Sequence, residues 1–113
     1  MKYFNKYKNK KIVIDGIIFD SQAEGKRYQE LKLLLKNGDI KDLELQPRFI
    51  LQDKFKKNGK TYRKIEYVAD FQYIDKNGKT IVEDVKGMET DVFKLKHKLF
   101  EYNYKDIELI LIK

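Results

Sequence analysis

Apolar residues change their spacing several times along the chain, and each change predicts a different element of secondary structure. In "KIVIDGIIF", residues 11–19, apolar residues flank Asp15-Gly16, a dipeptide suited to a tight turn with positive φ. This first segment is therefore predicted to be a small β-hairpin.

The next segment has the period of a helix. Ser21 and Glu24 have the S-x-x-E spacing of a capping box, which marks a helix N-terminus. Asn37-Gly38 supplies a stop. Between these signals, apolar residues recur at helical intervals at Tyr28, Leu31, Leu34 and Leu35.

From "LELQPRFIL", residues 43–51, the period changes towards two, which is typical of strands. Turn signals at Asn58-Gly59 and Asn77-Gly78 separate three predicted strands. "DIELILI", residues 106–112, closes the chain as a predicted buried strand. A second helix is predicted from about Asp91 to Tyr102, with one face made of Val92, Leu95, Leu99 and Tyr102.

After the hairpin, these elements follow in the order α, β, β, β, α, β. The order predicts an α/β (α+β) fold in which helices pack on both faces of a mixed sheet. The 113 residues suit a single domain over residues 1–113, with residues 1–10 as a basic N-terminal arm. No apolar stretch approaches the roughly 20 residues of a membrane span, and cysteine is absent. We therefore expect a cytoplasmic protein with no membrane partner.

The distribution of charge along the chain indicates a polyanionic partner. The 25 Lys and Arg outnumber the 18 Asp and Glu, which gives a formal net charge of +7. The excess is clustered, because residues 1–14 and 54–64 are rich in lysine and contain no acid. Such clusters neutralise phosphates and release counterions, although they can also serve only solubility. The predicted nucleic-acid-binding residues are Lys6, Lys8, Lys10, Lys56, Lys57, Lys60, Arg63, Lys94 and Lys96.

Two aspartates occupy strand positions that this residue type usually avoids. Asp70 stands between Ala69 and Phe71, and Asp84 precedes Val85. Alternation along a strand places the side chains of Asp84 and Lys86 on one face.

The turn at Asn77-Gly78 decides whether the aspartates meet. A two-residue turn would pair Asp70 with Val85, whereas a three-residue turn over 76–78 would pair Asp70 directly with Asp84. Facing carboxylates repel one another unless a cation lies between them, and Mg²⁺ prefers oxygen ligands.

These residues match a known arrangement. Glu24 on a helix, Asp70 on a strand and Asp84-x-Lys86 on the next strand resemble the active site of the PD-(D/E)XK nuclease superfamily. The αβββαβ order is similar to the restriction-endonuclease-like core of that superfamily, from about Phe19 onward. More closely, "FDSQAEGKRY", "LELQPRFIL", "YVADF" and "VEDVKG" look like a small phage-associated family of unassigned function placed in that superfamily.

Two positions depart from the pattern. Ala69 stands where the superfamily name has proline, and an aspartate, rather than a glutamate, precedes Val85.

The resemblance implies a metal-dependent endodeoxyribonuclease that hydrolyses phosphodiester bonds, acting on branched or recombining phage DNA. Asp70 and Asp84 would bind Mg²⁺ or Mn²⁺ together with the main-chain carbonyl of Val85. Glu24 would ligate a metal directly or through water.

Lys86 would orient the attacking water and help to lower its pKa, and Gln46 would orient a ligand or a phosphate. The lysine runs at 1–14 and 54–64 should border the acidic cluster and hold the DNA. Such an enzyme would work in the host cytoplasm if phage-encoded, and a homodimer would suit cleavage of two strands.

Each residue also has a structural alternative. Glu24 could be only the capping partner of Ser21, and Gln46 could only satisfy a strand end. Asp84 and Lys86 could form a surface ion pair of little energetic weight. The competing function is a basic nucleic-acid-binding module in which the acidic cluster is structural or inactive.

Overall fold

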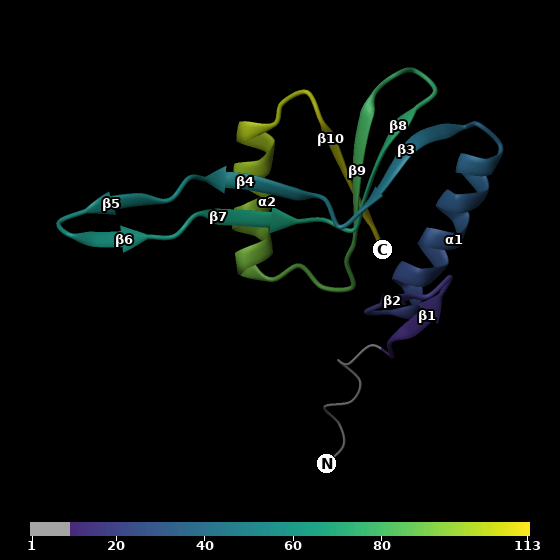
Figure 1. Cartoon of the computed structure of the whole chain (residues 1–113), viewed down its shortest axis with the longest axis horizontal. Coiled ribbons are helices and arrows are strands. Elements are labelled where there is room, and N and C mark those ends of the chain that lie inside the picture. The colour runs from purple at the N-terminus through teal and green to yellow at the C-terminus, as the bar shows by residue number, and fades with distance from the viewer. Residues whose placement is uncertain (1–9) are drawn as a thin grey trace, which may run out of the picture. The chain divides into compact units, whose positions relative to one another are not determined.

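The computed structural model describes residues 10–113, over which the chain forms ten strands and two helices (Figure 1). The chain divides into two compact units, the first ending at Ile40 and the second running from Lys41 to Lys113. Among the described residues, neither helix is long and apolar enough to cross a bilayer. The single domain over 1–113 stays a prediction.

The first unit contains the predicted hairpin and the predicted helix. Strands β1 (Ile12–Ile14) and β2 (Ile17–Phe19) pair antiparallel, and helix α1 (Gln22–Lys36) follows. Asp15 and Gly16 both have positive φ, 53° and 77°, as a two-residue hairpin turn of this hand requires. A side chain at Gly25 of α1 would meet Ile12 and Ile14 at about 3 Å, so this glycine lets the hairpin approach the helix closely.

Local hydrogen bonds fix both ends of α1. Ser21 is the N-cap, and its hydroxyl accepts a hydrogen bond from the Glu24 main-chain N–H at 3.1 Å. At the other end Gly38 has φ +81°, and its N–H donates to the Leu35 carbonyl. The Asp39 N–H donates to the Leu34 carbonyl at 2.8 Å, which completes a Schellman motif. Both predicted helix signals are therefore confirmed.

A four-stranded mixed sheet organises the second unit. Its order is β10 (Glu108–Ile112), β9 (Thr80–Val85), β8 (Phe71–Asp75) and β3 (Ile40–Leu45). β8 and β9 are antiparallel, whereas β9 and β10 are parallel and are joined by helix α2 (Asp91–Asn103). The predicted α+β class with a mixed sheet is confirmed.

The first of the three predicted strands, which begins with residues 43–51, is divided in two. β3 ends at Leu45, and β4 (Arg48–Gln52) leaves the four-stranded sheet to pair with β7 (Ile65–Val68). Gln46 has a left-handed φ of 53°, and Pro47 has no N–H with which to continue a ladder. A count of three strands between the helices was therefore wrong, because the structure has seven, β3 to β9.

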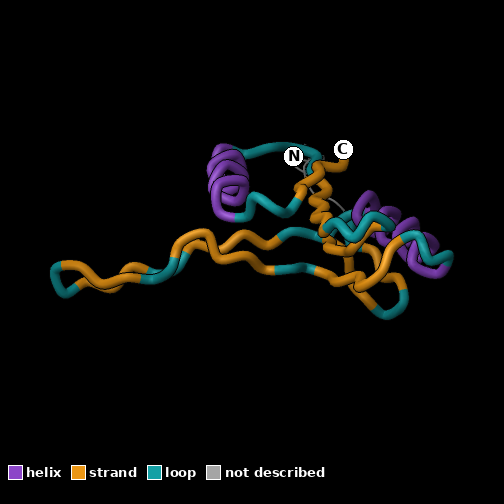
Figure 2. Tube along the Cα trace, turned by 90° about the horizontal axis from the view of Figure 1, so that it is seen from above, coloured by secondary structure: helices purple, strands orange, loops and turns teal. Residues whose placement is uncertain are grey.

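A two-stranded hairpin extends from β4 and β7. It consists of β5 (Phe55–Lys57) and β6 (Lys60–Tyr62), joined at Asn58-Gly59, where both residues have positive φ. Figure 2 shows it projecting as a thin ribbon beyond the β4–β7 pair. The turn predicted at Asn58-Gly59 is confirmed.

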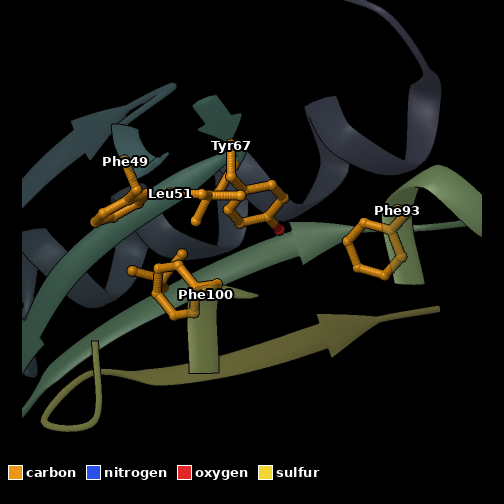
Figure 3. Close-up of a cluster of buried hydrophobic side chains, with 7 residues drawn as sticks. Phe49, Leu51, Tyr67, Phe93 and Phe100 are labelled. Carbon is orange, nitrogen blue, oxygen red and sulfur yellow. The ribbon is translucent and has the colours of Figure 1, made fainter. Parts of the chain in front are cut away.

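Aromatic side chains form the core between α2 and the strands that it covers (Figure 3). Phe100 of α2 is fully buried, with ring centroids 5.0 Å from Phe49 of β4 and 5.7 Å from Tyr67 of β7. Phe93, in the first turn of α2, packs beside Tyr67 and completes the cluster with Val82 of β9.

The face predicted for α2 exists but points to solvent. Val92, Leu95 and Tyr102 are 64%, 58% and 72% exposed, and only Leu99 packs against the core. Phe93 and Phe100 form a second apolar face at the same helical spacing and are the residues that are buried. Periodicity does not distinguish the two faces, since both repeat at helical intervals.

We expect Phe100→Ala to lower the free energy of unfolding by about 3–5 kcal/mol, because it removes a fully buried ring and leaves a cavity. Tyr102→Ala, on the exposed face of the same helix, should change it by less than about 0.5 kcal/mol. Urea unfolding of the two variants measures both values. Equal losses would contradict the burial described for α2.

Candidate active site

The turn between β8 and β9 sets the register of the two aspartates. Gly78 has φ +81°, and the Asp75 N–H donates to the Lys79 carbonyl at 2.9 Å, which closes a three-residue loop over 76–78. The ladder then pairs Phe71 with Glu83. The three-residue turn is therefore the one that the chain adopts. The ladder ends at the pair of Phe71 and Glu83, and Asp70 lies just beyond it, with its main-chain N–H donating to the Glu83 carbonyl and its carboxylate accepting from the Val85 N–H.

Two neighbouring carboxylates on β9 are buried on opposite faces of the sheet. Glu83 and Asp84 are only 1% and 2% exposed. Glu83 accepts a hydrogen bond from the Tyr73 hydroxyl, and Asp84 accepts one through Oδ2 from the Tyr67 hydroxyl. Burying a carboxylate is costly without a donor, and each of these carboxylates has a tyrosine as one donor.

Asp70 is held at the end of the β8 ladder. Its Oδ2 accepts a hydrogen bond from the Val85 N–H at 2.7 Å, and its main-chain N–H donates to the Glu83 carbonyl. The Asp70 carbonyl in turn accepts from the Gln46 N–H at 2.9 Å. The fold therefore brings Gln46 directly beside Asp70.

The conformation of Gln46 is unusual for its residue type. A left-handed φ of 53° costs a residue with a β-carbon on the order of 1–2 kcal/mol, and glycine would avoid that cost. The Gln46 side chain is exposed rather than packed in the core. Its position next to Asp70 is compatible with orienting a ligand, and its main-chain bond also fits the strand-end alternative.

Lys86 is placed between Asp84 and α2. Its Nζ lies 3.5 Å from Asp84 Oδ2 and 4.6 Å from the centroid of the Phe93 ring. The ion pair of the structural alternative is therefore present, but it is not at the surface, since the side chains of Asp84 and Lys86 are 3% and 27% exposed. The ring and the carboxylate hold the ammonium group at the edge of the buried acid.

Tyr67 is a site residue that the sequence pattern did not reveal. Burial raises the pKa of its hydroxyl far above its ordinary value, and the hydrogen bond and negative charge of Asp84 raise it further. The charge of Asp70 acts on the hydroxyl in the same direction, so both aspartates lie near it. An aromatic residue on an apolar strand face predicts only packing, and no signal in the sequence links its hydroxyl to Asp84.

A small pocket opens beside this group. It has a volume of about 270 Å³, and its lining includes Tyr67, Lys86, Thr90, Phe93 and Lys96. Lys96, one of the predicted nucleic-acid-binding residues, therefore contributes to the same pocket as Lys86.

The other predicted residues are distributed over the chain. Lys94 is exposed on α2 and Lys10 is exposed before β1, whereas Lys6 and Lys8 lie outside the described residues. Glu24 is buried in α1, and its ligation of the same metal stays a prediction.

Figure 1 shows the β5–β6 hairpin, which carries most of the basic run 54–64, at the far end of the β4–β7 pair from β8 and β9. This run therefore does not border the aspartates, which corrects that expectation. Four of its predicted residues belong to the projecting hairpin or follow it, and β7 separates them from Asp70 in the chain. They are Lys56, Lys57, Lys60 and Arg63.

The donor set fits a small divalent cation. Asp70, Asp84 and the Val85 carbonyl offer hard oxygen ligands, and the contacts of Asp84 with Tyr67 and Lys86 both use Oδ2. Within residues 10–113, no three His, Cys, Asp or Glu side chains gather in an arrangement that could hold a metal ion. Mg²⁺ commonly retains several waters and takes one or two carboxylates, so two carboxylates suffice for it.

Tyr67→Phe tests the hydroxyl contact through pH. Folded Tyr67 keeps its proton at a pH where the unfolded chain loses it, so its contribution to stability is lost as pH rises above about 10. The variant should be about 1–3 kcal/mol less stable at neutral pH. As pH rises above about 10, the free energy of unfolding of the variant should fall less steeply than that of the wild type. The two slopes should differ by up to about 1.4 kcal/mol per pH unit.

Urea unfolding at several alkaline pH values measures this slope. Tyr102→Phe, which changes an exposed tyrosine, is the matched control and should follow the wild type. Equal slopes for Tyr67→Phe and the wild type would show that neither burial nor the carboxylates raise the pKa of this hydroxyl.

Comparison with known proteins identifies a family but no function. Neither curated proteins nor solved structures give a significant match to the chain. A family model described as "Protein of unknown function (DUF1064)" matches residues 4–113, which is nearly the whole chain. The chain therefore belongs to the DUF1064 family of proteins of unknown function.

Proposed function

We propose that this protein is a metal-dependent endonuclease that hydrolyses phosphodiester bonds in DNA. The observation that carries the proposal is the arrangement at the adjoining ends of β8 and β9. There the Asp70 carboxylate accepts from the Val85 N–H next to the buried Asp84, and Lys86 Nζ lies 3.5 Å from Asp84 Oδ2. The resemblance of these residues to the PD-(D/E)XK nuclease motif supports the same activity.

Asp70, Asp84 and the Val85 carbonyl would hold Mg²⁺ or Mn²⁺. When bound, the cation would neutralise the negative charge that develops on the phosphate during cleavage. Tyr67 would act as a positioning residue, because its hydroxyl fixes one oxygen of Asp84.

Lys86 would act on the attacking water. Its ammonium group is held by Asp84 and by the Phe93 ring, so it has a defined position next to the acidic pair. A fixed positive charge there would orient the water and favour loss of its proton. Gln46 would contribute by orienting a ligand or a phosphate from its place beside Asp70.

A nucleic-acid substrate is supported by charge. The net charge of +7 is clustered rather than spread, and Lys96 lines the pocket next to Lys86. The resemblance favours branched or recombining phage DNA, so the protein would act in the host cytoplasm. A homodimer would allow two strands to be cleaved together.

One observation favours the alternative of a basic nucleic-acid-binding module. Asp84 and Asp70 both accept hydrogen bonds within the second unit, from Tyr67 and from the Val85 N–H. These contacts give both carboxylates a structural use. The decisive experiment incubates the wild type with linear, nicked and four-way-junction DNA, and with RNA, in Mg²⁺, Mn²⁺ or EDTA. Absence of metal-dependent cleavage of every substrate would leave the binding module as the function.

Asp84→Asn separates the metal ligand from the fold. The amide keeps the size of the side chain and an oxygen that can accept from Tyr67, so the fold should survive. Removing one charge from the proposed metal site should lower the cleavage rate by about two orders of magnitude or more, while DNA binding is retained. Glu83→Gln, which changes the neighbouring buried acid on the opposite face, is the matched control and should cleave as the wild type does. An Asp84→Asn variant that cuts at the wild-type rate would remove Asp84 from the mechanism.

Lys86→Ala tests the role assigned to the lysine. Turnover should fall by about a hundredfold or more, because the charge that acts on water is lost. Metal affinity, measured by titration with Mn²⁺, should remain, since the ion would be held by oxygen atoms. Lys79→Ala removes a lysine near the other end of β9 and should leave turnover unchanged. Loss of Mn²⁺ binding in Lys86→Ala, or full turnover, would contradict the assigned role.

A further inference from the structure

The hairpin of β5 and β6 has no packing role within the described residues. Every residue of both strands is exposed, and the two strands form a sheet of their own beyond β4 and β7 (Figure 2). An isolated two-stranded hairpin is at best marginally stable in water. We call this projecting element the β5–β6 arm (residues 54–63). Because it adds little to the core, its role is expected to lie in contacts outside the core.

Two aromatic rings occupy the base of the arm. Phe55 and Tyr62 lie directly opposite one another in the register, with ring centroids 4.8 Å apart and planes within 9°. They are 43% and 39% exposed, and the Lys60 ammonium lies 5.1 Å from the centroid of the Tyr62 ring. A stacked pair of this kind helps to hold a hairpin together, and its accessible area can extend the stack with another flat ring.

The charges on the arm are arranged unfavourably for the arm itself. Lys57 and Lys60 are directly opposite in the register, and like charges in that position repel. Alternation along each strand places them on the same face as Phe55 and Tyr62. The other face carries Lys56, and no acidic residue occurs from 54 to 64. Both faces are therefore suited to a polyanion, and one face adds an aromatic platform beside two cations.

We infer that the β5–β6 arm binds an unpaired stretch of nucleic acid. A base stacks on the Phe55–Tyr62 pair, and the adjoining backbone phosphates lie at Lys57 and Lys60. An unpaired strand is favoured over an intact duplex because the base faces of a duplex are already stacked, whereas an unpaired base can stack on an aromatic side chain. The inference builds on the proposed nucleic-acid role and does not depend on cleavage.

The position of the arm limits where the unpaired stretch lies. Tyr62 and Asp70 are joined through β7 and are eight residues apart in the sequence. At about 3.3 Å per residue, β7 and its flanks span at most about 26 Å. The substrate that this geometry fits has unpaired nucleotides within about 26 Å of the bond facing Asp70 and Asp84.

A tryptophan introduced into the arm tests the inference directly. The protein has no tryptophan, so Phe55→Trp creates a single fluorophore and keeps the aromatic pair. Titration in EDTA with a short oligothymidine should quench its fluorescence, because a stacked base quenches indole. A blunt duplex of equal length should quench it much less. Tyr102→Trp on exposed α2 is the control and should respond to neither probe.

Two further variants separate stacking from charge. Phe55→Leu should weaken oligothymidine binding about tenfold and duplex binding less than about twofold. Lys57→Gln combined with Lys60→Gln should lower the slope of log binding constant against log salt concentration for oligothymidine by about 1.4. The control, Lys36→Gln combined with Lys41→Gln, removes equal charge elsewhere and should leave this slope unchanged.

The outcomes decide between three uses of the arm. Absence of quenching by oligothymidine would reduce the aromatic pair to a support for the hairpin, and equal quenching by duplex would make the arm a groove-binding ribbon. Either result overturns the inference. Because the titrations contain EDTA, their result is separate from the cleavage assay, and either proposal can fail while the other stands.

Discussion

The buried carboxylate of Asp84 is the constraint on which the second unit depends. A carboxylate that is 2% exposed requires donors or positive charge, and the chain supplies both from different elements. Tyr67 brings a hydroxyl from β7, and Lys86 brings an ammonium group from the end of β9. Phe93 then covers the lysine from α2. The buried Asp84 carboxylate of β9 is thus linked to β7 through Tyr67 and to α2 through Lys86 and Phe93.

The hydrogen bonds around Asp84 and Asp70 both keep these acids in place and fix the orientation of their carboxylates. Hydrogen bonds that keep an acid buried also fix the orientation that a metal ligand needs. Asp70 is an example, because its carboxylate is held in place by the hydrogen bond that it accepts from the Val85 N–H at 2.7 Å. Substitutions that preserve shape and change charge are therefore more informative than truncations.

The division of the 43–51 segment has consequences beyond topology. Because Gln46 is left-handed and Pro47 cannot donate, β4 leaves the mixed sheet and pairs with β7. That pairing places Tyr67 over the face that carries Asp84, and it also supports the β5–β6 arm at the far end of the ribbon. The break at Gln46-Pro47 thus allows one chain segment to carry the charged, exposed β5–β6 arm while the buried acids stay in the mixed sheet.

Local chemistry is what the sequence by itself determined. The turns at Asp15-Gly16 and Asn58-Gly59 and the ends of α1 follow from residues within a few positions of one another, and each was predictable. Pairings between distant residues were decided only by the tertiary structure. It selected the three-residue turn at Gly78, buried Phe93 and Phe100 in place of Val92 and Leu95, and brought Tyr67 to Asp84. The physical reason is that a turn or a cap is settled by nearby backbone bonds, whereas the choice between two apolar faces or two registers depends on what else is available to pack against them.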